Sequence, residues 1–224
     1  GGHAIVNVTV DADATTRGNI TFGGVATISG NLDATGKNIA SNATVNAGGL
    51  AANTIDLDAT GNITDGNAAA VNFAVPLGKL SIDYTTGVVE ADTTVANFFA
   101  LGDGNLTIRE TNAINLQGVN FGATRVFDLT TGAAGTVTQD QPVVGGGLRL
   151  ITGAGATVTL DDAANDLVTL AANVNGTTFI NDLNALTIGT VVGKTATTDG
   201  VNTNGNTLTL VTGDLLTIGD ATGG

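Results

Sequence analysis

A triplet in which apolar residues flank one polar residue recurs through the second half of the chain. Alternation over a few residues places one set of side chains on each face of a strand, which distinguishes it from a helix. Apolar positions drawn from these segments follow one another at nearly regular steps of roughly 20 residues. Those positions are Leu106, Val126, Leu148, Leu167, Leu186 and Leu208.

A step of this length is close to one coil of a parallel β-solenoid. A unit this short cannot enclose a core alone, but stacked coils place each apolar side chain on its counterpart in the next coil. The sequence therefore predicts an all-β parallel β-helix with a continuous core, as a single segment over residues 1 to 224.

The first half of the chain repeats less regularly. Its apolar positions Ile20, Ile39, Ile63 and Leu80 follow one another at uneven steps. Residues 71 to 101 are the least repetitive, and a short helix, a bulged coil and a side loop all remain open there. We expect Phe121, Phe127 and Phe179 to stack in the core with the aliphatic side chains. Gly-Asn pairs that precede several strands are expected at the corners, where positive backbone angles are needed.

Composition excludes several classes of protein. Only two glutamates and three lysines occur, so helix-favouring charged residues are nearly absent. The formal net charge of −13 argues against a nucleic-acid-binding surface, which needs clustered Lys and Arg. No apolar run is long enough to span a bilayer, so no membrane insertion is expected. The absence of cysteine excludes disulfides and thiolate metal sites.

The repeats from residue 104 to 219 resemble those of filamentous-haemagglutinin-type exoproteins and autotransporter passengers. The likeness is carried by the stretch from Gly153 to Gly176 and by the Leu-Thr-Ile-Gly segment at residues 186 to 189. It implies a right-handed β-helix that is bacterial, secreted or displayed at the cell surface, and often adhesive. Complete family members also carry an export signal and a secretion domain, so we expect a section of a longer chain or a stacking subunit.

The expected function is therefore that of a stiff extracellular rod or fibre segment without catalysis. Its expected partners are neighbouring coils of the same or an identical chain, and host or surface glycans or proteins. Two alternatives stay open: a self-assembling filament or surface-layer subunit, and a carbohydrate-active enzyme on the same fold. The enzyme would need a cleft with at least two carboxylates and a cation.

No catalytic residue and no cofactor is predicted, but carboxylates at corners suggest calcium as an alternative to simple solvated turns. The strongest candidates are Asp161, Asp162 and Asp166; further pairs are Asp11 with Asp13 and Asp56 with Asp58. The glycine-rich nonapeptide that marks calcium-binding β-rolls does not recur.

Six Asn-x-Thr segments form a formal glycosylation pattern, which corner asparagines and outward threonines also explain. Their asparagines are Asn7, Asn19, Asn42, Asn62, Asn105 and Asn175.

Overall fold

The computed structural model describes residues 7–12, 17–66 and 71–219, and every regular element among them is a β-strand. This part of the chain contains no helix, and so none that could cross a membrane. The strands are β1 (Asn7–Asp11), β2 (Ile20–Phe22), β3 (Ala26–Ile28), β4 (Asn31–Gly36), β5 (Ile39–Ser41), β6 (Val45–Ala47), β7 (Thr54–Ala59), β8 (Ile63–Asp65), β9 (Phe73–Glu110), β10 (Ile114–Asn120), β11 (Val126–Thr131), β12 (Val137–Ile151), β13 (Val158–Leu160), β14 (Asp166–Asn173), β15 (Thr178–Asp182), β16 (Leu186–Ile188), β17 (Thr190–Val192), β18 (Thr197–Asp199), β19 (Val201–Asn202), β20 (Leu208–Thr212) and β21 (Leu216–Ile218).

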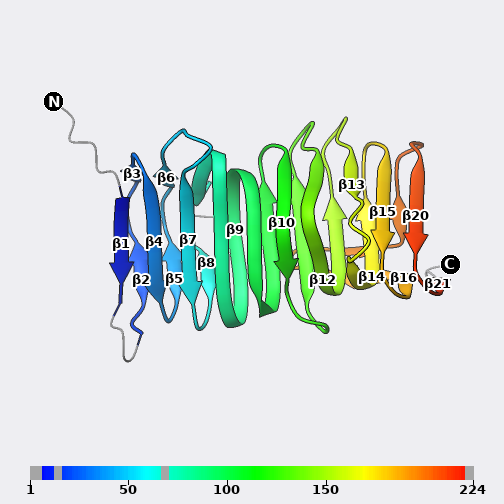
Figure 1. The fold of residues 1–224 in the computed structure, drawn as a ribbon, viewed down its shortest axis with the longest axis horizontal. Coiled ribbons are helices and arrows are strands. Elements are labelled where there is room, and N and C mark those ends of the chain that lie inside the picture. The colour runs from blue at the N-terminus through cyan, green and yellow to red at the C-terminus, as the bar shows by residue number, and fades with distance from the viewer. Residues whose placement is uncertain (1–6, 13–16, 67–70, 220–224) are drawn as a thin grey trace.

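The strands stack in parallel along the long axis of an elongated molecule (Figure 1). One column of partners in successive coils runs through Ile20, Ile39, Ile63 and Val89. A second column runs through Leu106, Phe127, Leu148, Leu170, Ile188 and Ile218. The predicted parallel β-helix is confirmed, although its coils vary in length and the one from Ile188 to Ile218 is the longest of the second column.

Several predicted partners belong to different faces of the coil. Leu106 pairs with Phe127 and not with Val126, so the predicted pairing is one residue out of register. Leu80 pairs with Ile55, whereas Ile63 continues to Val89. Spacing alone could not separate these faces, because each coil has more than one strand of similar sequence.

The last predicted steps are also wrong in register. Leu148 pairs with Leu170, while Leu167 pairs with Gly145. Leu186 pairs with Leu216, while Leu208 pairs with Thr178. The error at Leu208 arises from an extra hairpin between Leu186 and Leu208, which lengthens this coil, whereas the error at Leu167 is a shift of three residues along β14.

The core is a column of buried aliphatic side chains, joined by a small aromatic group. Phe127 lies with its ring centroid 6.2 Å from that of Phe98 and 5.9 Å from that of Phe121. Glycine makes room for them, since a Cβ on Gly145 would clash with the Phe121 ring. Phe179 is only half-buried and points outward between buried Thr178 and Ile180, so its predicted place in the core is wrong.

Residues 71 to 101, where three alternatives were open, are almost entirely extended. From Phe73 the chain forms β9, a 38-residue strand that continues around the corners of the solenoid (Figure 1). Its partners lie on both sides: Ile55 pairs with Leu80, and Phe127 with Leu106. The stretch is therefore part of the stack, without a helix.

Asparagines form ladders at the corners. The Asn38 Nδ2 donates to Asn19 Oδ1 at 2.8 Å, and Asn38 Oδ1 accepts from the backbone N–H of Asn62 at 2.8 Å. Asn62 Oδ1 in turn accepts from the Val88 N–H at 2.9 Å. The carboxamides of Asn38 and Asn62 thus satisfy backbone donors of the following coil. The positive backbone angle predicted for Gly-Asn corners is found at Gly205, but not at Gly18, Gly61 or Gly104.

One element departs from the parallel stack: β17 and β18 form an antiparallel hairpin, closed by a bond from Gly193 N–H to Ala196 C=O. We call residues 190–199 the flank hairpin. It lies over an outer row of residues, one from each successive coil. Their side chains face outward, while their neighbours on either side along the strand face the core. These row residues are nevertheless buried, with exposures of 6%, 3%, 8% and 0% for Thr107, Asp128, Arg149 and Ala171.

Candidate functional site

A groove of ≈ 750 Å³ lies on the outer surface beside the tip of the flank hairpin. It is within the size range of small-molecule sites, and it gathers ionisable side chains from distant parts of the sequence. Its charged and hydroxyl-bearing lining residues are Asp65, Glu90, Asp92, Arg109, Glu110, Thr111, Thr130, Thr131, Lys194 and Thr195. We refer to it as the ionic groove.

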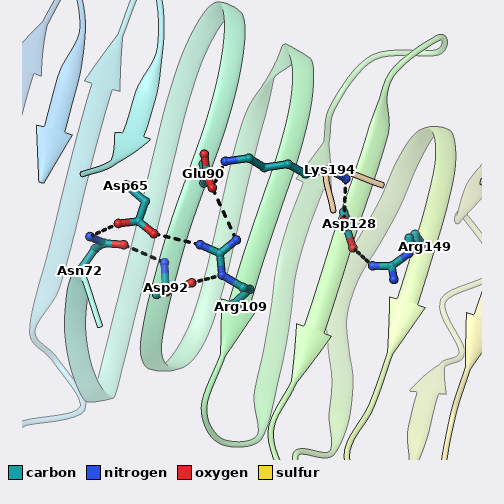
Figure 2. Close-up of polar contacts among 8 residues, drawn as sticks. All are labelled: Asp65, Asn72, Glu90, Asp92, Arg109, Asp128, Arg149 and Lys194. Carbon is teal, nitrogen blue, oxygen red and sulfur yellow. Dashed lines mark hydrogen bonds and ion pairs between the residues drawn. The ribbon is translucent and has the colours of Figure 1, made fainter. Parts of the chain in front are cut away.

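Arg109 is at the centre of the ionic groove (Figure 2). It follows the buried Ile108 in β9, so strand alternation turns its side chain outward. Its guanidinium contacts three carboxylates: Asp65 Oδ2 at 2.9 Å, Glu90 Oε1 at 3.5 Å and Asp92 Oδ1 in direct contact. One planar cation therefore ties together β8 and two parts of β9, a geometry suited to arginine.

Asn72 holds the Asp65 side of this network. Its Nδ2 donates to Asp65 Oδ1 and to the Ser41 carbonyl, both at 3.1 Å. Its Oδ1 accepts from the backbone N–H of Asp92 at 2.9 Å. The two carboxylates are thus positioned by backbone-anchored contacts as well as by Arg109.

Burial dominates the electrostatics of the groove wall. Desolvation raises the pKa of Asp92, and the neighbouring Arg109 only partly opposes it. Desolvation also raises the pKa of Glu110 to about 7, against hydrogen bonds from Thr93 and from backbone N–H groups. The groove therefore holds a carboxyl group that changes protonation near neutral pH, as functional sites often do.

The flank hairpin supplies the remaining cation. The Lys194 ammonium contacts Glu90 Oε1, and the Lys194 backbone N–H donates to Asp128 Oδ2 at 3.0 Å (Figure 2). Asp128 also accepts from Arg149 at 2.6 Å, while Arg149 Nε donates to Thr198 Oγ1 at 2.8 Å. Residues near 194 thereby become one wall of a groove whose floor comes from residues 65 to 132.

This arrangement meets the requirement set for the enzyme alternative, a cleft with two or more carboxylates and a cation. It also suits hydrogen bonding to a polar ligand, since carboxylates, guanidinium, ammonium and threonine hydroxyls line one surface. Within residues 7–12, 17–66 and 71–219, no group of three or more His, Cys, Asp or Glu side chains is placed to hold a metal ion.

The calcium candidates lie elsewhere and each has a role in local structure. Asp162 Oδ1 accepts from the Ala164 N–H at 2.9 Å, as in a turn. Asp166 Oδ1 accepts from Asn184 Nδ2 at 3.2 Å, and the Asp161 carbonyl accepts from Asn181. They are neighbours in sequence that support separate contacts, and calcium binding by them stays an untested expectation.

Asp56 and Asp58 lie on one outward face of β7, where each carboxylate has its own neighbours. Asp58 receives both guanidinium nitrogens of Arg17, at 2.9 and 3.1 Å. Asp56 is in register with Asp33 of the preceding coil. Asp11 ends β1, while Asp13 lies outside the described residues.

Most asparagines of the glycosylation pattern take part in contacts between coils. The side-chain oxygens of Asn7, Asn19, Asn62 and Asn105 accept hydrogen bonds from the next coil. Asn175 uses its Nδ2, the atom a glycan would occupy, to donate to the Thr152 carbonyl at 2.8 Å. These contacts favour the structural explanation of the pattern.

Sequence reasoning did not identify the ionic groove, although one signal was present. The only two glutamates, Glu90 and Glu110, lie on either side of Arg109 in a chain that otherwise uses Asp. Lys194 had no such signal, because its approach to Glu90 depends on the path of the flank hairpin.

Comparison of the chain with protein-family models, with curated proteins and with solved structures finds no match in any of the three, so the arguments for function rest on the residues themselves.

Proposed function

We propose that this chain is a structural and adhesive rod segment of a bacterial secreted or cell-surface protein, acting outside the cell without catalysis. The observation that supports this role most is the stacking of core residues in successive coils, from Ile20 to Ile188 along the long axis. Such a stack resists bending and presents a long outer surface of Thr, Asn and Asp side chains.

The ionic groove is the proposed contact point of this rod with a ligand. Its mixed charges and hydroxyl groups suit a polar partner such as a surface glycan, whose hydroxyls can both donate and accept. The lining carboxylates outnumber the two cations, and Glu90 already contacts both Arg109 and Lys194, so the groove favours neutral glycans over those that bear a carboxylate or sulfate.

Binding of the purified chain to immobilised neutral, sialylated and sulfated oligosaccharides tests the proposal. We expect the neutral glycans to bind in preference to the acidic ones, and Lys194→Ala to weaken that binding at least several-fold, since it removes one of the two cationic hydrogen-bond donors of the groove. Lys37→Ala, which changes a lysine outside the groove lining, is the matched control. Equal binding by the two variants, or no binding to any glycan, contradicts the adhesive role of the groove.

A carbohydrate-active enzyme is the second candidate, favoured by the carboxylates and cations of the same groove. It is distinguished by turnover. Incubation of each glycan that binds, followed by mass spectrometry, should leave the glycan intact if the chain is only adhesive. Cleavage that Glu90→Gln abolishes would establish the enzyme instead.

The filament alternative is favoured by the coil that contains β20 and β21. Leu208, Leu216 and Ile218 are counterparts of buried residues one coil earlier, yet they are 37%, 38% and 77% exposed. An apolar surface beside an open strand edge can pair with a further coil, either of the same chain or of a second copy. Electron microscopy distinguishes isolated rods from continuous fibres, and only fibres that disappear with Ile218→Asp support self-assembly through this surface.

A further inference from the structure

We propose that the flank hairpin, residues 190–199, is a latched flap, which lifts from the outer face of the solenoid while the coils beneath it stay folded. Lys194 is the latch. The inference concerns movement of one element and does not depend on which ligand the groove binds.

The coils under the flank hairpin are complete without it. The ladder that joins β9, β11, β12 and β14 runs beneath it without interruption. The ladder also continues past it, because Leu170 pairs with Ile188 and Ala172 with Val201. Lifting the hairpin therefore breaks no contact of the parallel stack.

The surface that lifting would expose is largely polar. Thr107, Asp128 and Arg149 are on the outer face and can be hydrated there, so opening leaves no large apolar core surface in water. Only Ala171 in this row is apolar, and it is small.

The contacts that close the flap are mostly polar, and one of them is an ion pair between side chains, that of Lys194 with Glu90. Val191 is the one large apolar side chain that the hairpin buries. The other contacts are Lys194 with Glu90 and Asp128, and Thr198 with Arg149. Closing also removes water from the Asp128–Arg149 pair, and this desolvation offsets much of the electrostatic gain. The balance favours a closed flap that opens at modest cost and more readily in salt.

The hairpin is built to move as a unit. Its strands are joined by the β17–β18 ladder and by Thr190 Oγ1 donating to Asp199 Oδ1 at 2.6 Å. Its ends return to one place, since Gly200 N–H donates to the Gly189 carbonyl at 3.0 Å. Opening would withdraw Lys194 and Thr195 from the groove wall and uncover the Asp128–Arg149 pair beside it.

Thiol labelling tests the flap directly, because the chain has no cysteine of its own. Single variants Thr107→Cys and Ala171→Cys place a thiol under the hairpin, Ala172→Cys places one in the core, and Val168→Cys gives an exposed reference. Rates of reaction with a maleimide are measured on the folded chain. We expect both covered thiols to react at least roughly tenfold faster than the core thiol, and more slowly than the exposed one.

The latch is tested by adding Lys194→Gln to each cysteine variant, with Lys37→Gln as the control. We expect Lys194→Gln to accelerate labelling at 107 and 171 by about two- to fivefold, the effect of losing a surface ion pair, and to leave position 172 unchanged. Raising the ionic strength should act in the same direction.

If the covered and the core thiols react at one common rate, and Lys194→Gln accelerates both alike, then the hairpin leaves only when the coils unfold. A thiol at 107 that reacts as fast as the one at 168 would show that no closed flap exists. If the Ala171→Cys substitution itself holds the hairpin open because Cys is larger than Ala, the labelling rate at position 107 is the deciding result, because Thr and Cys are similar in size. Slow labelling at 172 verifies the fold of each variant.

Discussion

Glu110 shows how one residue can link this fold to pH. It is buried at a corner, where its carboxylate accepts from Thr93 Oγ1 at 2.8 Å and from the N–H groups of Val95 and Asn112 at 3.1 and 3.0 Å. Burial outweighs these bonds and raises its pKa to about 7 from an ordinary value of 4.5. The folded chain therefore holds the proton more tightly than the unfolded chain does.

This shift has a definite sign for stability. A raised carboxyl pKa contributes stability that is complete below pH 4.5 and is lost as the pH rises through 7. Replacing Glu110 by Gln should flatten this part of the pH dependence by up to roughly 3 kcal/mol, since one pKa unit is about 1.4 kcal/mol. Urea unfolding of both chains at pH 5 and pH 8 measures it, with Asp140→Asn as an exposed control; an equal pH dependence for Glu110→Gln and the parent chain contradicts the prediction.

Gly102 illustrates a residue required for close packing. A Cβ there would clash with the backbone oxygen and ring of Tyr84, whose hydroxyl donates to the Gly104 carbonyl at 2.9 Å. We expect Gly102→Ala to lower the free energy of unfolding by about 1–3 kcal/mol, because rigid backbone must shift. Gly23→Ala, with nothing within 4 Å of the added Cβ, should change it by less than about 0.5 kcal/mol. If thermal or urea unfolding shows similar losses of stability for Gly102→Ala and Gly23→Ala, the explanation by close packing is ruled out.

At the scale of the element, strand stacking depends on residues that recur in space. Leu148 is fully buried between Phe127 and Leu170 of adjoining coils. Leu148→Ala should cost about 2–5 kcal/mol through lost burial and a cavity, whereas the outward and exposed Val168→Ala should cost less than about 1 kcal/mol. Chemical unfolding of the two variants checks this, and a small loss for Leu148→Ala would mean that the column collapses easily around it.

The strands and their pairing show how much of the fold could be predicted from the sequence. Alternating triplets identified the strands, because a two-residue period directly reports which face is buried, and their recurrence at roughly 20 residues identified the parallel stack. The choice of Phe127 over Val126, or Leu170 over Leu167, needed the path of the chain around each corner. The ionic groove was beyond this reasoning, because Asp65, Arg109 and Lys194 meet only through stacking and through a hairpin that breaks the repeat.

At the scale of the whole molecule, each coil contacts mainly its neighbours, so stability should fall from the middle toward the ends. Residues of β1 and β21 are largely exposed, while β9 to β14 carry most of the buried core. We expect hydrogen exchange to be slowest in β9 to β12 and fastest in β1, β20 and β21. Uniform protection along the chain would indicate a single cooperative unit instead.

The enlarged coil between Leu186 and its partner Leu216 has a practical consequence. An excursion can leave the middle of a strand line and return while the ladders on either side keep their alignment, so length at that position is decoupled from the architecture. The turn at residues 193 to 196 is accordingly a location where foreign peptides could be grafted for display on a stiff carrier.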